Sequence, residues 1–78
     1  MTTEKIEEIV IDTEEIQLDQ FLKWAGVIAS GGEIKPLLAE RRIKRNGETE
    51  SARRRKLHDG DVIEIEGVGA WKVIHKKG

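Results

Sequence analysis

The dipeptide Asn46-Gly47 constrains the fold of this chain more than any other pair of residues. It lies between two short segments, residues 43–45 and 48–50, whose composition suits extended structure. A two-residue type I′ turn needs a positive φ at both central positions, and Asn-Gly adopts that geometry readily. The sequence therefore predicts a β-hairpin over residues 43–50.

The predicted hairpin lies inside a strongly basic segment, residues 40–56, which reads ERRIKRNGETESARRRK. Residues 41–56 hold eight Lys or Arg and two Glu, whereas the rest of the chain holds six basic and thirteen acidic residues. The net charge of −1 conceals this segregation. A basic patch of this density favours the binding of a polyanion, and a solvated charged loop is the alternative.

Two helices are predicted before the hairpin. From Ile16 on, apolar residues recur with the spacing of one helix face, and Gly26 is the expected stop. These apolar residues are Leu18, Phe21, Leu22 and Ala25. Ser30 and Glu33 have the spacing of a capping box, which predicts a second short helix over residues 32–40. Gly31 and Gly32 beside that cap form either a phosphate-binding helix start or a simple tight turn, and both interpretations stay open.

Strands are predicted over residues 4–11, 62–66 and 70–74, from their β-branched, partly alternating composition. Residues 51–56 are expected to form a basic loop that is held less firmly than the hairpin. Phe21, Trp24 and Trp71 are expected to pack in or beside the core, which disfavours binding of single strands by base stacking.

Length and composition exclude several classes of protein. A chain of 78 residues forms one small domain, and without cysteine it has no disulfide or thiolate metal site. No signal peptide is recognisable, and no run approaches the roughly 20 apolar residues of a membrane span. His58 and His75 lie far apart in sequence, so we expect no catalytic residue, no metal site and no cofactor.

Four segments in this order resemble the S-four (S4) domain, an RNA-binding domain first described in a ribosomal protein of that name. They are LDQFLK (18–23), SGGEIK (30–35), RNGE (45–48) and KLHDGDVIEI (56–65). The resemblance is greatest to small free-standing bacterial members. It implies an α+β fold, with a two-helix αL motif followed by a β-hairpin and a small, mostly antiparallel sheet. It also implies an N-terminal acidic segment (1–15), an RNA-binding domain (16–66) and a last strand with a basic tail (67–78).

The resemblance further implies a non-enzymatic, cytoplasmic, monomeric protein that docks on structured RNA, most simply ribosomal RNA during ribosome assembly, with no membrane or small-molecule partner. The residues expected to face RNA are Lys23, Gly32, Lys35, Arg41, Arg42, Lys44, Arg45, Asn46, Arg53, Arg54, Arg55 and Lys56. Binding to transfer RNA on stalled large subunits remains an alternative. Further alternatives are a module that binds an acidic protein and an accessory domain of an RNA-modifying enzyme.

Overall fold

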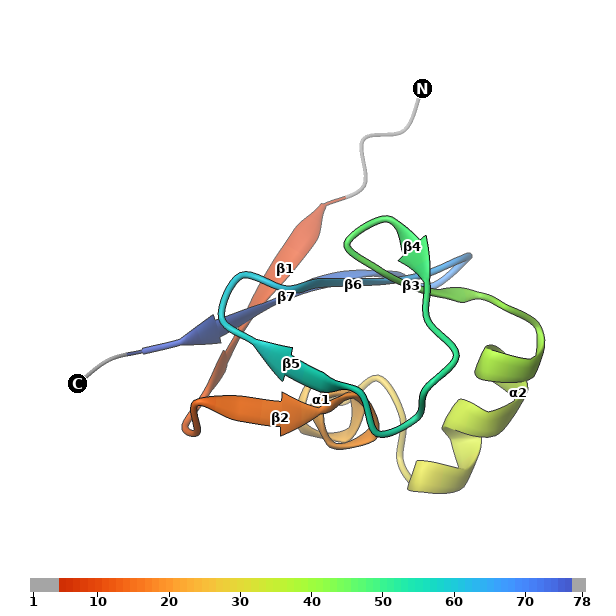
Figure 1. The fold of residues 1–78 in the computed structure, drawn as a ribbon, viewed down its shortest axis with the longest axis horizontal. Helices are drawn as coiled ribbons and strands as arrows, with labels where there is room; N and C mark the ends of the chain where they lie inside the picture. Colours follow the sequence, from red (N-terminus) through yellow and green to blue (C-terminus); the bar gives the residue numbers. More distant parts are fainter. Residues whose placement is uncertain (1–4, 77–78) are drawn as a thin grey trace.

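A five-stranded sheet with the order β1-β7-β6-β3-β4 spans the molecule in the computed structural model, which describes residues 5–76. Its strands are β1 (Ile6–Ile11), β3 (Ile43–Arg45), β4 (Glu48–Thr49), β6 (Val62–Ile65) and β7 (Gly69–His75). A second sheet pairs β2 (Glu15–Gln17) with β5 (Lys56–His58). Figure 1 shows this two-stranded ribbon on the same side of the large sheet as the helices.

The helical part is small. It consists of α1 (Leu18–Trp24), the single 3₁₀ turn η1 (Gly31–Glu33) and α2 (Ile34–Ala39), which continues directly from η1. Pro36 is accommodated because it is the third residue of α2, and the backbone N–H groups of the first helical turn have no hydrogen-bond acceptor within the helix. None of the helices within residues 5–76 is long and apolar enough to cross a bilayer.

The predicted fold class, an α+β fold with a two-helix αL motif followed by a hairpin and a mostly antiparallel sheet, is wrong. Strands make up 39% of the structure, and the two α-helices have only seven and six residues. The large sheet is mixed, because β1 runs parallel to β7 with Ile6 opposite Ala70 and Ile11 opposite His75. Glu4 and the predicted tail residues Lys77 and Gly78 lie outside the described residues.

The first helix is shorter than predicted because residues 15–17 are extended. Ile16 pairs with Leu57 in the β2–β5 ribbon, and this pairing brings both side chains toward the core. The helix then begins at Leu18, whose backbone N–H donates to the carbonyl of Arg55 at 2.8 Å. A helix start leaves N–H groups without partners, and here a distant loop supplies the acceptors.

The hydrophobic core lies between the large sheet and the helices. The predicted stripe is confirmed for Leu18, Phe21 and Leu22, which are fully buried on α1, whereas its fourth residue, Ala25, follows the helix and is half-buried against the core. The sheet contributes Ile11, Ile43, Ile63, Ile65 and Val73, and the ribbon contributes Leu57.

The predicted hairpin is also confirmed. Asn46 and Gly47 have φ values of 52° and 86° and connect β3 to β4.

Candidate nucleic-acid interface

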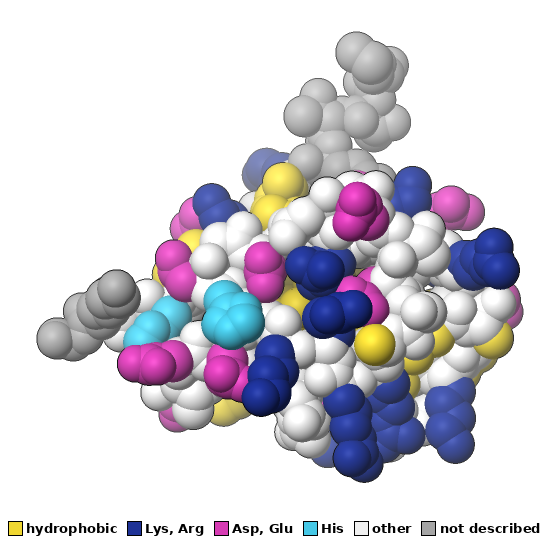
Figure 2. All heavy atoms as spheres, in the orientation of Figure 1, with side chains coloured by type: hydrophobic (Ala, Val, Ile, Leu, Met, Phe, Trp, Pro, Cys, Tyr) yellow, Lys and Arg dark blue, Asp and Glu magenta, His cyan; other side chains and the backbone are white. Residues whose placement is uncertain are grey.

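Lys and Arg side chains gather over α2 and the loop between β4 and β5, whereas acidic and His side chains gather near β2 and β5 (Figure 2). The twelve residues predicted to face RNA lie on several elements. Lys23 is in α1, Gly32 in η1 and Lys35 in α2. The others follow α2, as Arg41 and Arg42 before β3, Lys44, Arg45 and Asn46 in the hairpin, Arg53, Arg54 and Arg55 in the loop, and Lys56 at the start of β5.

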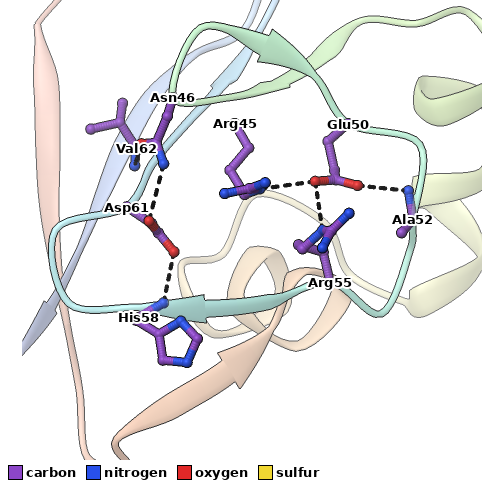
Figure 3. A network of polar contacts seen from close by, with 8 residues as sticks. All are labelled: Arg45, Asn46, Glu50, Ala52, Arg55, His58, Asp61 and Val62. Carbon is purple, nitrogen blue, oxygen red and sulfur yellow. Dashed lines mark hydrogen bonds and ion pairs between the residues drawn. The ribbon is translucent and has the colours of Figure 1, made fainter.

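Two of these arginines converge on one buried carboxylate. The Nε groups of Arg45 and Arg55 each donate to Oε1 of Glu50 at 2.9 Å (Figure 3). The backbone N–H of Ala52 donates to the other oxygen, Oε2, also at 2.9 Å. The Glu50 residue is only 5% exposed, whereas the side chains of Arg45 and Arg55 are 28% and 47% exposed. We call these three charged side chains the Glu50 clamp.

The charge state of the clamp follows from these contacts. Burial alone would raise the pKa of Glu50, because it penalises the charged form. The hydrogen bonds from Ala52, Arg45 and Arg55 outweigh it, so the pKa of Glu50 lies below its ordinary value. The hydrogen bond to Glu50 in turn raises the pKa of Arg45. Glu50 is therefore ionised at neutral pH.

The loop that contains Arg53 is tied to the start of α1. Nε of Arg53 lies 3.3 Å from Oδ2 of Asp19, and the Asp19 N–H donates to the Arg53 carbonyl at 3.2 Å. A Cβ placed on Gly31 would lie 3.7 Å from the Arg53 guanidinium, so the loop also reaches η1. The sequence predicts that residues 51–56 are held less firmly than the hairpin. The contacts of Arg53 instead fasten this loop to α1 and η1.

Two further residues of the predicted set, Arg42 and Lys56, use their polar groups within the fold. Arg42 donates to the Glu66 carbonyl at 2.6 Å and lies 3.5 Å from the Glu40 carboxylate. Lys56 lies 3.4 Å from a carboxylate oxygen of Glu15, in an exposed pair. Surface pairs of this kind contribute little to stability and are easily exchanged for another anion.

Asn46 has a structural role at the hairpin turn. Its Oδ1 accepts from the Val62 N–H at 2.9 Å, and its Nδ2 donates to Asp61 at 3.1 Å. Asp61 also accepts from the His58 N–H at 2.8 Å, so the side chains join the hairpin turn to the turn before β6 (Figure 3). The polar groups of Asn46 are therefore already bonded within the protein.

Gly32 lies within the predicted capping box, which Ser30 and Glu33 form. The Glu33 carboxylate accepts from the backbone N–H groups of Ser30 and Ala29 at 2.9 and 2.7 Å. The negative charge of Glu33 at this helix start would repel a phosphate, so these contacts favour the tight turn over a phosphate-binding helix start.

Five basic residues from the predicted set form no ion pair within residues 5–76 and are exposed. We call them the unpaired cations, and they are Lys23, Lys35, Arg41, Lys44 and Arg54. Such a cation can bind a phosphate without first breaking an ion pair within the protein. The charged surface thus contains three groups: arginines fixed by buried acids, two cations in pairs with exposed acids, and the unpaired cations.

Sequence reasoning missed the two buried acids, Asp19 and Glu50, which hold the fixed arginines. For Glu50 a weak signal existed, because Arg45 and Arg55 flank it at a spacing of five residues on each side. A spacing of five residues matches neither the period of a helix nor that of a strand. The three side chains meet only because the loop returns toward the hairpin.

The two tryptophans differ in exposure. Trp71 is buried, as predicted, whereas Trp24 is 55% exposed and donates from Nε1 to the Val10 carbonyl at 2.8 Å. Within residues 5–76 no group of three or more potential metal-binding side chains lies together.

Comparison with known proteins places these observations in a family. The S4 domain family matches residues 9–73. The chain is 52% identical over 67 residues to a protein of Bacillus subtilis (strain 168) named probable ribosome maturation protein RlbA. That alignment covers 86% of this chain and 94% of the relative, which is itself a small protein. The resemblance seen in the sequence is confirmed, and the chain belongs to the S4 domain family.

Proposed function

We propose that this protein is a non-enzymatic RNA-binding protein of ribosome maturation, which docks on folded ribosomal RNA in the cytoplasm. The observation that carries the proposal is the 52% identity to a probable ribosome maturation protein over nearly the whole relative. The basic surface over α2 and the β4–β5 loop supports it, because RNA is the polyanion of the ribosome.

The kinds of side chain on this surface suit recognition of a folded RNA backbone. Arg binds phosphate oxygens through a planar fork, and Lys acts as a compact point charge. The major groove of A-form RNA is too narrow for side chains to read, so a surface of this kind recognises shape and phosphates rather than sequence. Phe21 and Trp71 are buried, and among the described residues Trp24 alone offers an exposed aromatic ring, so the surface has few rings for base stacking.

Removing two unpaired cations tests the proposal without disturbing the fold. Lys35→Gln with Arg54→Gln removes two exposed charges from α2 and the loop. The matched control, Lys5→Gln with Lys76→Gln, removes two exposed charges before β1 and after β7. The probe is deproteinised ribosomal RNA, refolded with Mg²⁺, and affinity is measured over a range of salt concentrations.

The expected result is weaker binding by the first double variant, with the slope of log affinity against log salt reduced by about 2, one for each lost phosphate contact. The control keeps the slope of the unmodified protein. Equal slopes for both double variants would contradict the proposed surface. Tighter binding of refolded transfer RNA, or of polyglutamate as an acidic polypeptide, would favour the corresponding alternative partner.

A further inference from the structure

We propose that Glu50 is a positioning residue for RNA, which holds Arg45 and Arg55 together as one preformed binding site for a backbone phosphate. This inference rests on the proposed function and goes further, because it assigns phosphate binding to a specific pair of side chains and to the buried acid between them. It concerns two arginines whose positive charge Glu50 compensates only in part.

The geometry of the Glu50 clamp supports the inference. Each arginine uses its Nε–H for Glu50 Oε1, and a guanidinium has four further N–H donors on its two terminal nitrogens. Within residues 5–76 those terminal nitrogens have no hydrogen-bond partner. Both side chains remain partly exposed, at 28% and 47%, so the remaining donors are accessible from the surface.

The clamp also offsets two costs of binding. Two guanidinium groups repel one another, and Glu50 lowers that repulsion because both bond to a single oxygen. Free arginines lose side-chain freedom when they bind a phosphate, and here that ordering has already taken place in the folded protein. The three charges still sum to one positive charge, so an anion is attracted to the site.

Two accounts of Glu50 predict changes of opposite sign. If only local charge matters, Glu50→Gln increases the positive charge and tightens RNA binding. If Glu50 positions the two arginines, the same substitution weakens RNA binding by about tenfold, the cost of ordering arginine side chains that were previously fixed. The sign of the change in affinity therefore separates the two accounts.

Glu48→Gln is the matched control. Glu48 lies opposite Arg45 in the β3–β4 register, is exposed, and makes no hydrogen bond to Arg45. The substitution Glu48→Gln removes one negative charge beside Arg45, as Glu50→Gln does, and leaves the hydrogen bonds of the Glu50 clamp in place. We expect Glu48→Gln to bind refolded ribosomal RNA as tightly as the unmodified protein or slightly more tightly.

Arg55→Lys supplies a second variant that keeps the charge and lies at an exposed position. In the unmodified background it weakens RNA binding, because lysine lacks the Nε–H and the fork. In the Glu50→Gln background it has little further effect, since the positioned pair is already lost. A merely structural Glu50 would leave the effect of Arg55→Lys the same in both backgrounds.

All binding is measured at a temperature where denaturation curves show each variant to be folded. Weaker binding by Glu50→Gln together with a smaller effect of Arg55→Lys in that background supports the inference. Unchanged or tighter binding by Glu50→Gln overturns it, even if the unpaired cations still bind RNA as proposed. Absence of RNA binding by the unmodified protein would instead overturn the proposed function.

Discussion

The guanidinium Nε of Arg53 lies 3.3 Å from Oδ2 of Asp19, a residue only 5% exposed in the first turn of α1. The two residues are 34 positions apart in the chain, and a backbone hydrogen bond between them accompanies the ion pair. This relationship fastens the basic loop to the helical part of the protein. Arg53 and its neighbour Arg54 consequently have different roles, although the sequence presents them as equivalent.

Charge reversal should separate these two arginines. Arg53→Glu places a second carboxylate against buried Asp19, and we expect the free energy of unfolding to fall by about 2 kcal/mol. Arg54→Glu changes an exposed side chain without an ion pair in the described part of the chain, and its effect should stay within about 0.5 kcal/mol. Urea denaturation measures both. Equal stability of the two variants would show that the Asp19 pair does not hold the loop.

Glu50 should make stability depend on pH in the acidic range. Its pKa is lower in the folded protein than the ordinary value of 4.5, so its stabilising effect is complete above pH 4.5. The effect is lost as the pH falls through the folded-state pKa, where the carboxylate becomes protonated. We expect the difference in melting temperature between the unmodified protein and Glu50→Gln to shrink as the pH falls. A difference that stays constant from neutral to acidic pH would be inconsistent with the clamp.

The hairpin turn requires glycine for reasons of backbone conformation alone. Gly47 has a φ of 86°, and a Cβ there would meet no atom within 4 Å. Gly47→Ala should therefore cost about 1 kcal/mol through left-handed strain. Gly32→Ala is the control, because Gly32 does not have a positive φ and its nearest contact would be 4.0 Å away. Similar losses at both positions in a denaturation experiment would refute this account of the turn.

Strand β1 should contribute to the free energy of unfolding through the side chains that it buries in the core. Ile11 is 1% exposed in β1, whereas its neighbour Val10 is 50% exposed. We expect Ile11→Ala to lower the free energy of unfolding by about 2–4 kcal/mol, since it leaves a cavity in the core. Val10→Ala should change it by less than about 0.5 kcal/mol. Chemical denaturation of both variants checks this, and a small effect of Ile11→Ala would argue against the β1–β7 pairing.

Features determined by neighbouring residues could be predicted from the sequence. Asn46 and Gly47 specify their own turn, Ser30 and Glu33 specify their own cap, and the spacing of Leu18, Phe21 and Leu22 marks a helix face. Each of these signals lies within a few positions of the chain, so no knowledge of the fold is needed.

Features that depend on distant partners could not be predicted. Glu15–Gln17 becomes a strand only because Lys56–His58 lies beside it, and that pairing shortens the first helix. The parallel pairing of β1 with β7 joins the first strand to the last, and no local pattern indicates it. Glu50 likewise acquires its role only when the loop carries Arg55 back toward Arg45.

The most direct test of the account is to crosslink the protein to RNA in living cells and to sequence the RNA that it carries. The unmodified protein should recover ribosomal RNA, concentrated in one folded region, and Lys35→Gln with Arg54→Gln should lose that enrichment. Recovery of transfer RNA in place of ribosomal RNA, or the same yield from the double variant as from the unmodified protein, would contradict it.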